Sequence, residues 1–196
     1  MLEKDQRRLR VLVLADCHDI LPGMGGKEID LVLGCGDVPR WVLIEAAGQC
    51  PRARVMAVKG NHDNEEPFGD GIQPLHLEVR RLGGISLGGF NGAWQYKPRG
   101  YNLYSQEQAS ELLDAFPRVD VMAAHNSPFG IHERGDPAHQ GFIGLRRYIH
   151  HARPHYLIHG HQHVNEDGLV ENTRVVGVCG ARILELEIPF PGLDQS

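Results

Sequence analysis

Short runs of aliphatic residues, each ending near a glycine or an aspartate, place the strongest limit on how this chain folds. Such runs occupy residues 10–15, 31–33 and 54–58. They are too short for helices that span a core, and they are typical of strands buried on both faces. Residues 39–49 lie between the second and third runs, with a proline at the start and apolar residues at helical spacing, which predicts a helix. This alternation of strand and helix indicates an α/β fold.

The rest of the chain continues the same alternation. We expect strands at residues 119–124 and 154–159, helices at 105–116 and 141–151, a hairpin-like region formed by 75–82 and 85–90, and a closing pair of strands in 173–188 broken at Gly180. Ser105 and Gln108 have the spacing of a capping box, which supports the first of these helices. No repeat or linker divides the chain, so we expect residues 1–196 to form a single domain.

Composition narrows the choice of partners and compartment. The formal net charge of -5 is the opposite of the basic excess that whole-surface binding to nucleic acid requires, although it leaves room for a local basic patch. No apolar run approaches the ~20 residues that cross a bilayer, so no membrane partner is expected. The four cysteines have no CxxC spacing, which favours free thiols. The short apolar stretch after Arg10 is interrupted by Asp16 and does not fit a signal peptide. We therefore expect a cytoplasmic protein.

Polar clusters follow the predicted strands, at the edge where α/β sheets place their ligand sites. In order they are Asp16-Cys17-His18, Gly36-Asp37, Gly60-Asn61-His62-Asp63, His125-Asn126-Ser127-Pro128 and Gly160-His161-Gln162-His163. In extended backbone, residues two apart share a face, so we expect the pair Asp16 and His18 to reach one site, and the pair His161 and His163 likewise.

These clusters offer carboxylate, amide and imidazole ligands, a mixture that suits a first-row transition metal such as manganese, iron or zinc. The candidate metal ligands are Asp16, His18, Asp37, Asn61, His125, His161 and His163. Seven side chains exceed what one ion needs, whereas two divalent ions with one bridging ligand fit the number. Taken singly, each residue is more often a turn former, a cap or a hydrogen-bonded histidine. Five such clusters in order at strand ends favour the metal site.

In this order the motifs resemble those of the calcineurin-like metallophosphoesterase superfamily. The match runs from Asp16 to His163, about three quarters of the chain, with every motif intact. The resemblance implies an α/β fold of two facing mixed β-sheets flanked by helices. It also implies an enzyme that hydrolyses a phosphate ester with a hydroxide bound by two metal ions.

The family pattern also implies a role for each residue. Asp16, His18 and His163 would hold one ion, Asn61, His125 and His161 the other, and Asp37 would bridge them. His62 would face the phosphate and either protonate the leaving oxygen or stabilise developing charge. The segment after Asp37 lacks the acidic residue found in the family's protein phosphatases, and the Gly-Asn-His turn ends in Asp63 where they have glutamate. The sequence therefore favours a small-molecule phosphate ester, above all a phosphodiester, as substrate.

Two other functions stay open at this point. One is a nuclease acting on short or single-stranded nucleic acid, for which aromatic side chains would stack on bases. The other is a non-catalytic scaffold, although such a chain should have lost metal ligands and this one has lost none.

Two long segments without regular pattern, residues 91–104 and 126–139, are candidates for substrate recognition. Their candidate side chains are Asn91, Trp94, Tyr96, Arg99, His132, Arg134 and His139. The alternative is that these side chains merely pack the loops onto the domain.

Overall fold

The computed structural model describes residues 6–18, 26 and 28–190, which form strands, helices and one short 3₁₀ helix. The helices are α1 (Arg40–Gln49), α2 (Gln106–Asp114) and α3 (Ile143–Ala152), and the 3₁₀ helix η1 is Pro137–His139. The strands are β1 (Gln6–Ala15), β2 (Leu31–Cys35), β3 (Arg54–Val58), β4 (Gln73–Pro74), β5 (Arg80–Leu82), β6 (Ile85–Phe90), β7 (Ala93–Trp94), β8 (Leu103–Tyr104), β9 (Val121–Ala124), β10 (Tyr156–His159), β11 (Asp167–Val170), β12 (Thr173–Gly177) and β13 (Gly180–Pro189).

The first sheet has five strands in the order β13-β1-β2-β3-β4. Strands β1, β2 and β3 are parallel, with Val11 opposite Leu31 and Val32 opposite Val55. The long strand β13 closes the sheet by pairing antiparallel with the whole of β1. Because parallel strands end at the same edge, the residues after β1, β2 and β3 come together there.

The second sheet has six strands in the order β11-β12-β10-β9-β6-β5. Its central strands β6, β9, β10 and β12 are parallel, and β5 and β11 pair antiparallel at the edges. Strands β7 and β8 form a separate small parallel pair. Both large sheets are therefore mixed, as expected.

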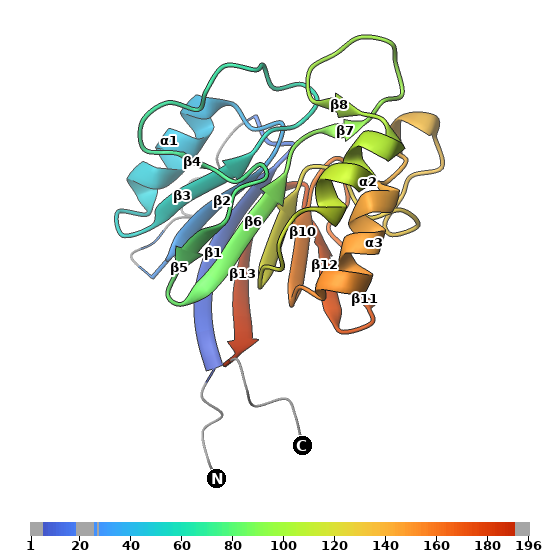
Figure 1. Ribbon diagram of the computed structural model, residues 1–196. Helices are drawn as coiled ribbons and strands as arrows, with labels where there is room; N and C mark the ends of the chain where they lie inside the picture. The colour runs from blue at the N-terminus through green and yellow to red at the C-terminus, as the bar shows by residue number, and fades with distance from the viewer. Residues whose placement is uncertain (1–5, 19–25, 27, 191–196) are drawn as a thin grey trace, which may run out of the picture.

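The two sheets face each other, with α1 on the outer face of the first and α2 and α3 on the outer face of the second (Figure 1). Successive side chains of β1 point to opposite faces of the sheet, and both faces are covered. Val11 and Val13 belong to the core between the sheets, whereas Leu12 and Leu14 pack with α1. On the other side, Leu157 of β10 packs with α2 and α3. Each of these strands is buried on both faces, which explains the nearly continuous apolar runs in the sequence.

Most predicted elements are confirmed, and two need correction. Strand β3 has the predicted bounds, and Ser105 and Gln108 form the predicted capping box at the start of α2. In the hairpin region residues 80–82 pair antiparallel with β6, but residues 75–77 do not continue that hairpin. They cross between the sheets instead: Leu75 donates its amide to Ala57 of β3, and the segment touches β6 only through a parallel bridge of His76 with Gly89 and the bond from the amide of Leu77 to Gly89. The expected closing strands β12 and β13 do not pair with each other but join different sheets.

Other features of the described residues bear on the sequence-based expectations. No helix among them is long and apolar enough to cross a membrane. All four cysteines lie within them, and none forms a disulfide. That residues 1–196 form one domain stays a prediction.

Candidate functional site

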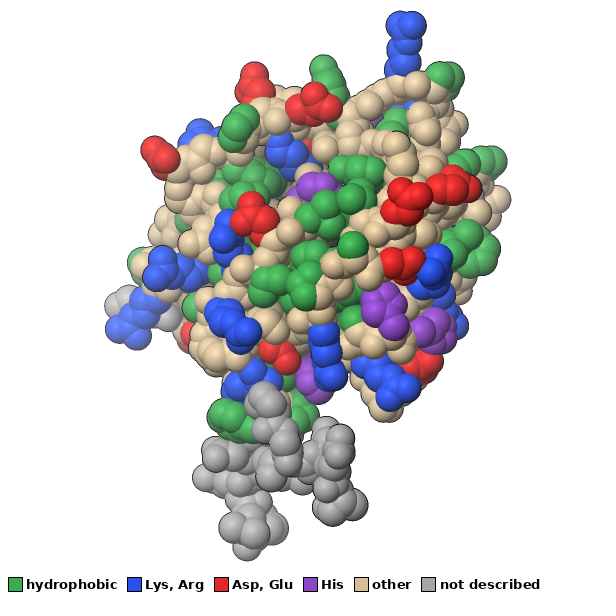
Figure 2. Space-filling view, viewed as in Figure 1, with side chains coloured by type: hydrophobic (Ala, Val, Ile, Leu, Met, Phe, Trp, Pro, Cys, Tyr) green, Lys and Arg blue, Asp and Glu red, His purple; other side chains and the backbone are tan. Residues whose placement is uncertain are grey.

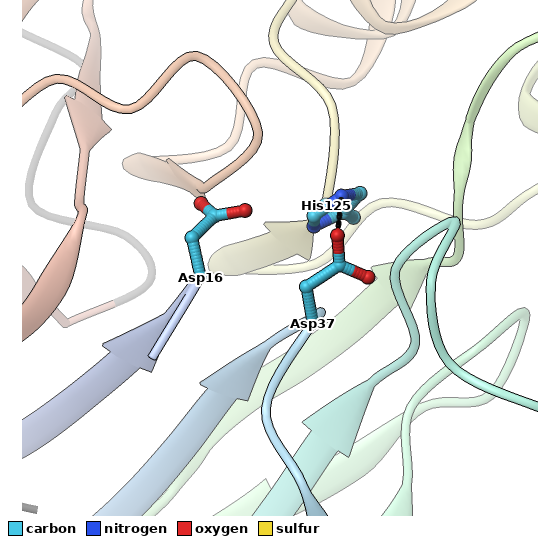
Figure 3. Close-up of side chains that lie close together, drawn as sticks. All are labelled: Asp16, Asp37 and His125. Carbon is cyan, nitrogen blue, oxygen red and sulfur yellow. Dashed lines mark ion pairs between the residues drawn. The ribbon is translucent and has the colours of Figure 1, made fainter. Parts of the chain in front are cut away.

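The polar clusters of both sheets meet at one edge of the molecule. Asp16 follows β1, Asp37 follows β2 by two residues, and Asn61 lies beyond β3 in the first sheet; His125 follows β9 and His161 lies beyond β10 in the second. Asp16, Asp37 and His125 each offer a ligand atom, and these atoms lie within 4.8 Å of one another. Figure 3 shows the three side chains pointing toward one another from the ends of separate strands. The site is thus built across the seam between the two sheets.

His125 occupies the buried centre of this cluster, with no exposed surface. Its Nδ1 lies 3.0 Å from the carbonyl oxygen of Cys35, which can only accept, so Nδ1 carries a proton. Its Nε2 faces two oxygens, Oδ1 of Asn61 at 3.0 Å and Oδ2 of Asp37 at 3.4 Å. A neutral imidazole would present a lone pair to both oxygens, so a proton or a cation is needed between them. This arrangement fits a metal ligand whose second nitrogen is oriented by a backbone carbonyl.

The shifted pKa values of His125 and Asp37 indicate that the two aspartates favour a positive charge beside them. Burial lowers the pKa of His125, but the hydrogen bond and charge of Asp37 and the charge of Asp16 outweigh burial and raise it to about 9. Burial raises the pKa of Asp37, yet His125 and the amide of His62 bring it down to about 2. Burial raises the pKa of Asp16. The half-buried carboxylate of Asp16, the buried carboxylate of Asp37 and the buried imidazole of His125 form a donor set that a divalent ion would satisfy.

His161 presents a second oriented imidazole. Its Nε2 lies 3.0 Å from the carbonyl oxygen of Ala138, so that nitrogen carries the proton and Nδ1 keeps its lone pair. Its backbone amide donates to Oδ2 of Asp16 at 2.7 Å, and its ring centroid lies 4.9 Å from that of His125. Burial lowers the pKa of His161 to about 3, which keeps the ring neutral, as a metal ligand must be.

A cavity of about 470 Å³ opens over this cluster. It is lined by Asp16, His18, Asp37, Asn61, His62, Tyr96, Ala138, His139, His161 and His163. All of the predicted metal-binding and phosphate-facing residues are therefore in its lining except His125, which lies buried against Asn61 and Asp37. The side chains of His18, His62 and His163 are exposed, and the amide of His62 donates to Oδ1 of Asp37 at 2.8 Å.

The backbone reaches this arrangement through tight turns. Asp16, Asp37, His161 and His163 all have positive φ values, of 48°, 52°, 63° and 52°. Such values are uncommon for residues with a side chain and cost of order 1–3 kcal/mol each, and they concentrate at functional sites. The extended backbone that we expected for the pairs Asp16/His18 and His161/His163 is therefore wrong. Turns, rather than the pleat of a strand, bring both members of each pair into the cavity lining.

The glycines in the motifs leave room for ligands from neighbouring strands. A Cβ atom on Gly60 would stand 2.0 Å from Oδ1 of Asp37, and one on Gly36 would stand 2.4 Å from Nδ1 of His125. Both distances are far inside van der Waals contact. The Gly-Asp and Gly-Asn-His-Asp patterns therefore follow from the close approach of the buried side chains.

Most of the loop residues proposed to bind substrate lie elsewhere. Tyr96 and His139 line the cavity. Trp94 donates from Nε1 to the carbonyl of Pro137 at 2.8 Å, His132 pairs with buried His159 at 2.9 Å, and Arg99 is exposed. Asn91 accepts from the amide of Lys59 at 2.8 Å, and the amide of Arg134 donates to Gln162 at 3.1 Å. None of these five is in the cavity lining, and the contacts of Trp94, His132 and Asn91 hold the loops in place.

Two residues stabilise the turns of the site through hydrogen bonds, and neither of them was assigned a role from the sequence. Asp63 accepts hydrogen bonds from the amides of Asp37 and Gly60, and so joins two of the turns. Gln162 is fully buried, and its side-chain amide donates to Asn126, Ser127 and the carbonyl of His139. Gln162 lies between the proposed ligands His161 and His163 in the sequence. A side-chain amide at that position could have indicated a residue that supports the ligands through hydrogen bonds.

Two facing mixed sheets with a carboxylate and imidazole cavity place this chain among the α/β proteins whose polar site lies at the ends of the strands. Residues 9–182 match the calcineurin-like phosphoesterase superfamily domain, so the chain belongs to that family. Members of this family are hydrolases of phosphate esters that typically bind divalent metals. No curated protein matches the chain significantly.

Solved structures agree on the fold. The protein TT1561 of Thermus thermophilus has a TM-score of 0.62 at 13% identity, covering 88% of this chain and 89% of its own. The phosphopantetheinyl hydrolase of Mycobacterium tuberculosis has a TM-score of 0.60 at 15% identity, covering 97% and 99%. At these identities the similarity extends to the fold alone.

Proposed function

We propose that this protein is a dinuclear-metal phosphoesterase that hydrolyses a small-molecule phosphodiester. The observation that carries the proposal is the convergence of Asp16, Asp37 and His125, whose ligand atoms lie within 4.8 Å of one another beneath an open cavity. The donor set is mixed and its histidines are oriented by backbone carbonyls, as in metal sites.

The roles follow the family pattern applied to these positions. Asp16, His18 and His163 would hold one divalent ion, Asn61, His125 and His161 would hold the other, and Asp37 would be shared between them. The central position of Asp37 supports the last assignment, because one of its oxygens faces His125 and the other accepts the amide of His62. Manganese, iron and zinc all suit this donor set.

Bound there, two divalent ions would neutralise phosphate charge and lower the pKa of water by several units. The remaining step, at the leaving oxygen of the ester, would depend on a side chain of the protein. His62 is exposed in the cavity lining, and its backbone amide donates to Asp37 beside the proposed metal ligands. There it would protonate the leaving oxygen of the ester as a general acid or stabilise the charge that develops on it.

The size of the cavity favours a small substrate. A volume of about 470 Å³ is in the range of pockets that take a metabolite-sized ligand. One structural neighbour is named a phosphopantetheinyl hydrolase, a name that denotes hydrolysis at a phosphate-containing group. The replacement of the protein-phosphatase signature after Asp37 supports a diester over a phosphoprotein.

The nuclease remains the second candidate, and the surface gives it little support. Acidic and basic side chains are interspersed over the face shown in Figure 2, and the net charge is -5. Of the loop aromatics proposed for stacking, only Tyr96 lines the cavity. A non-catalytic scaffold is disfavoured because every proposed ligand is present. The lack of disulfides among the described cysteines supports the expected cytoplasmic location.

A substrate panel tests the proposal. Metal-reconstituted protein is assayed with bis(p-nitrophenyl) phosphate, p-nitrophenyl phosphate, cyclic nucleotides and short oligonucleotides. We expect the diester or a cyclic nucleotide to give the highest kcat/KM. A clear preference for the monoester would replace diester by monoester hydrolysis, and a preference for oligonucleotides would favour the nuclease. Failure to hydrolyse any of them would favour the scaffold.

A further inference from the structure

The side chain of Asn61 makes a different contact at each end of its amide. Its oxygen Oδ1 lies 3.0 Å from Nε2 of His125, and its nitrogen Nδ2 donates to the hydroxyl of Tyr96 at 3.3 Å. Asn61 is only 4% exposed, so few other groups reach it. The amide is therefore held between a proposed ligand on one side and a loop tyrosine on the other.

The orientation of this amide matters for metal binding. Hard cations bind the oxygen of an asparagine and not its NH₂ group, so a rotation of the amide by half a turn removes a ligand. A buried NH₂ group without an acceptor is unfavourable, because it has lost its hydrogen bond to water and gained none in return. An acceptor on the Nδ2 side therefore stabilises the orientation in which Oδ1 faces the cluster.

We propose that Tyr96 is a positioning residue, which holds Asn61 with its oxygen toward the metal centre. This inference rests on the proposed dinuclear site. Tyr96 comes from the 91–104 loop, and one face of its ring is near the ammonium of Lys97, 5.1 Å from the ring centroid. Tyr96 contributes its hydroxyl group to the site, whereas the sequence suggested it only as a candidate for contact with substrate.

The loop that carries Tyr96 is anchored so that this contact is maintained. Asn102 donates from Nδ2 to the carbonyl of Gly60 at 2.9 Å and to that of Asp63 at 3.2 Å, which ties the loop to the turn that contains Asn61. Trp94 ties the other side of the loop to Pro137 at 2.8 Å. The hydroxyl of Tyr96 and the amide of Asn61 therefore belong to segments with a fixed relative position.

The test is the affinity for Mn²⁺ of the full chain after removal of the Tyr96 hydroxyl. Tyr96→Phe should weaken binding of one of the two ions by about tenfold and leave the other unchanged, as loss of a group that orients a ligand does. Tyr101→Phe makes the same chemical change at an exposed position of the same loop and should leave both affinities as in the wild type. The thermal midpoints of the metal-free variants show whether the fold is intact.

The same substitution in a variant that already carries Asn61→Asp distinguishes a role in positioning Asn61 from a general increase in the mobility of the loop. In Asn61→Asp both oxygens can bind a cation, so adding Tyr96→Phe should change Mn²⁺ affinity by less than about twofold. An equal loss on both backgrounds, or unchanged affinity in Tyr96→Phe, would overturn the positioning role. Failure of the wild type to bind two Mn²⁺ ions would instead overturn the proposed dinuclear site, so the two failures are distinguishable.

Discussion

Asp63 accepts a hydrogen bond from the backbone amide of Asp37, with 2.9 Å between Oδ2 and the nitrogen. The same oxygen accepts the amide of Gly60 at 2.8 Å. One carboxylate thus joins the turn after β2 to the turn after β3. The relative position of the proposed bridging residue and the proposed ligand Asn61 depends on this connection.

Asp63→Ala should lower both stability and metal binding. Two partly buried amides lose a charged acceptor, for which we expect a loss of about 1.5–3 kcal/mol in the free energy of unfolding. Urea denaturation of the metal-free protein measures this loss, and elemental analysis measures the metal content. Asp70→Ala, at an exposed position in the same connection, should change stability by no more than about 0.5 kcal/mol. Equal effects of the two substitutions would show that Asp63 does not join the turns.

Gly60→Ala should disrupt the site through a single methyl group. A Cβ atom there would stand 2.0 Å from Oδ1 of Asp37, so the turn or the carboxylate must move. We expect weaker metal binding and a loss of several kcal/mol in stability, as is typical of overpacking. Gly48→Ala is the matched control, because its Cβ meets nothing within 4 Å in α1, and it should stabilise by about 0.5–1 kcal/mol. Wild-type metal affinity in Gly60→Ala would contradict the close packing of Asp37.

The strands and the polar clusters at their ends could be predicted from the sequence because both depend on local pattern. The run at residues 54–58 predicted β3 with its observed bounds, and the capping box at Ser105 predicted the start of α2. Strand β11 was missed because its residues are mostly exposed or half-buried, so no apolar run marks it. The separation of β12 and β13 into different sheets depends on long-range pairing that local pattern does not encode.

The loops of the candidate site likewise depend on long-range contacts that local sequence pattern does not encode. Tyr96 and Trp94 are two residues apart and both aromatic, yet one lines the cavity and the other is bonded to Pro137. Which of them reaches the site depends on how two distant loops meet, and composition alone does not decide it. The positive φ of Asp16 likewise results from the packing of the site rather than from a turn signature in the sequence.

The Asp120 carboxylate should make stability depend on pH in the acid range. Burial raises its pKa, but hydrogen bonds from Ser86 and the charge of Arg7 lower it further than burial raises it, so the net shift is downward. A lowered pKa in the folded state adds stability above the unfolded value, and this stability is lost as pH falls through the folded value. Asp120→Asn should therefore destabilise the protein at pH 7 by about 1 kcal/mol or more, and the difference from wild type should shrink below about pH 4.

Urea titrations at several pH values measure this dependence. Asp114→Asn removes the carboxylate of an exposed ion pair with Arg147 and should have little effect at any pH. A difference between wild type and Asp120→Asn that stays constant from about pH 7 to about pH 3 would contradict the role of the charge.

His62→Ala should leave both metals bound and slow turnover by about 10²–10⁴-fold, as expected for loss of a general acid. Because good leaving groups need little protonation, the loss should be smaller for aryl than for alkyl esters. Steady-state kinetics with both kinds of ester, together with metal analysis, measures this. Equal losses for the two would favour charge stabilisation over proton donation.

The most direct test of the proposed function is a titration of metal-stripped protein with Mn²⁺, in which bound ions and hydrolysis of bis(p-nitrophenyl) phosphate are followed together. We expect no turnover without metal, two ions per chain at saturation, and activity that rises with the second ion. Asp37→Asn, which weakens the proposed bridge, should bind fewer ions and lose activity. Full turnover in the metal-free protein, or full activity with a single bound ion, would contradict a dinuclear centre.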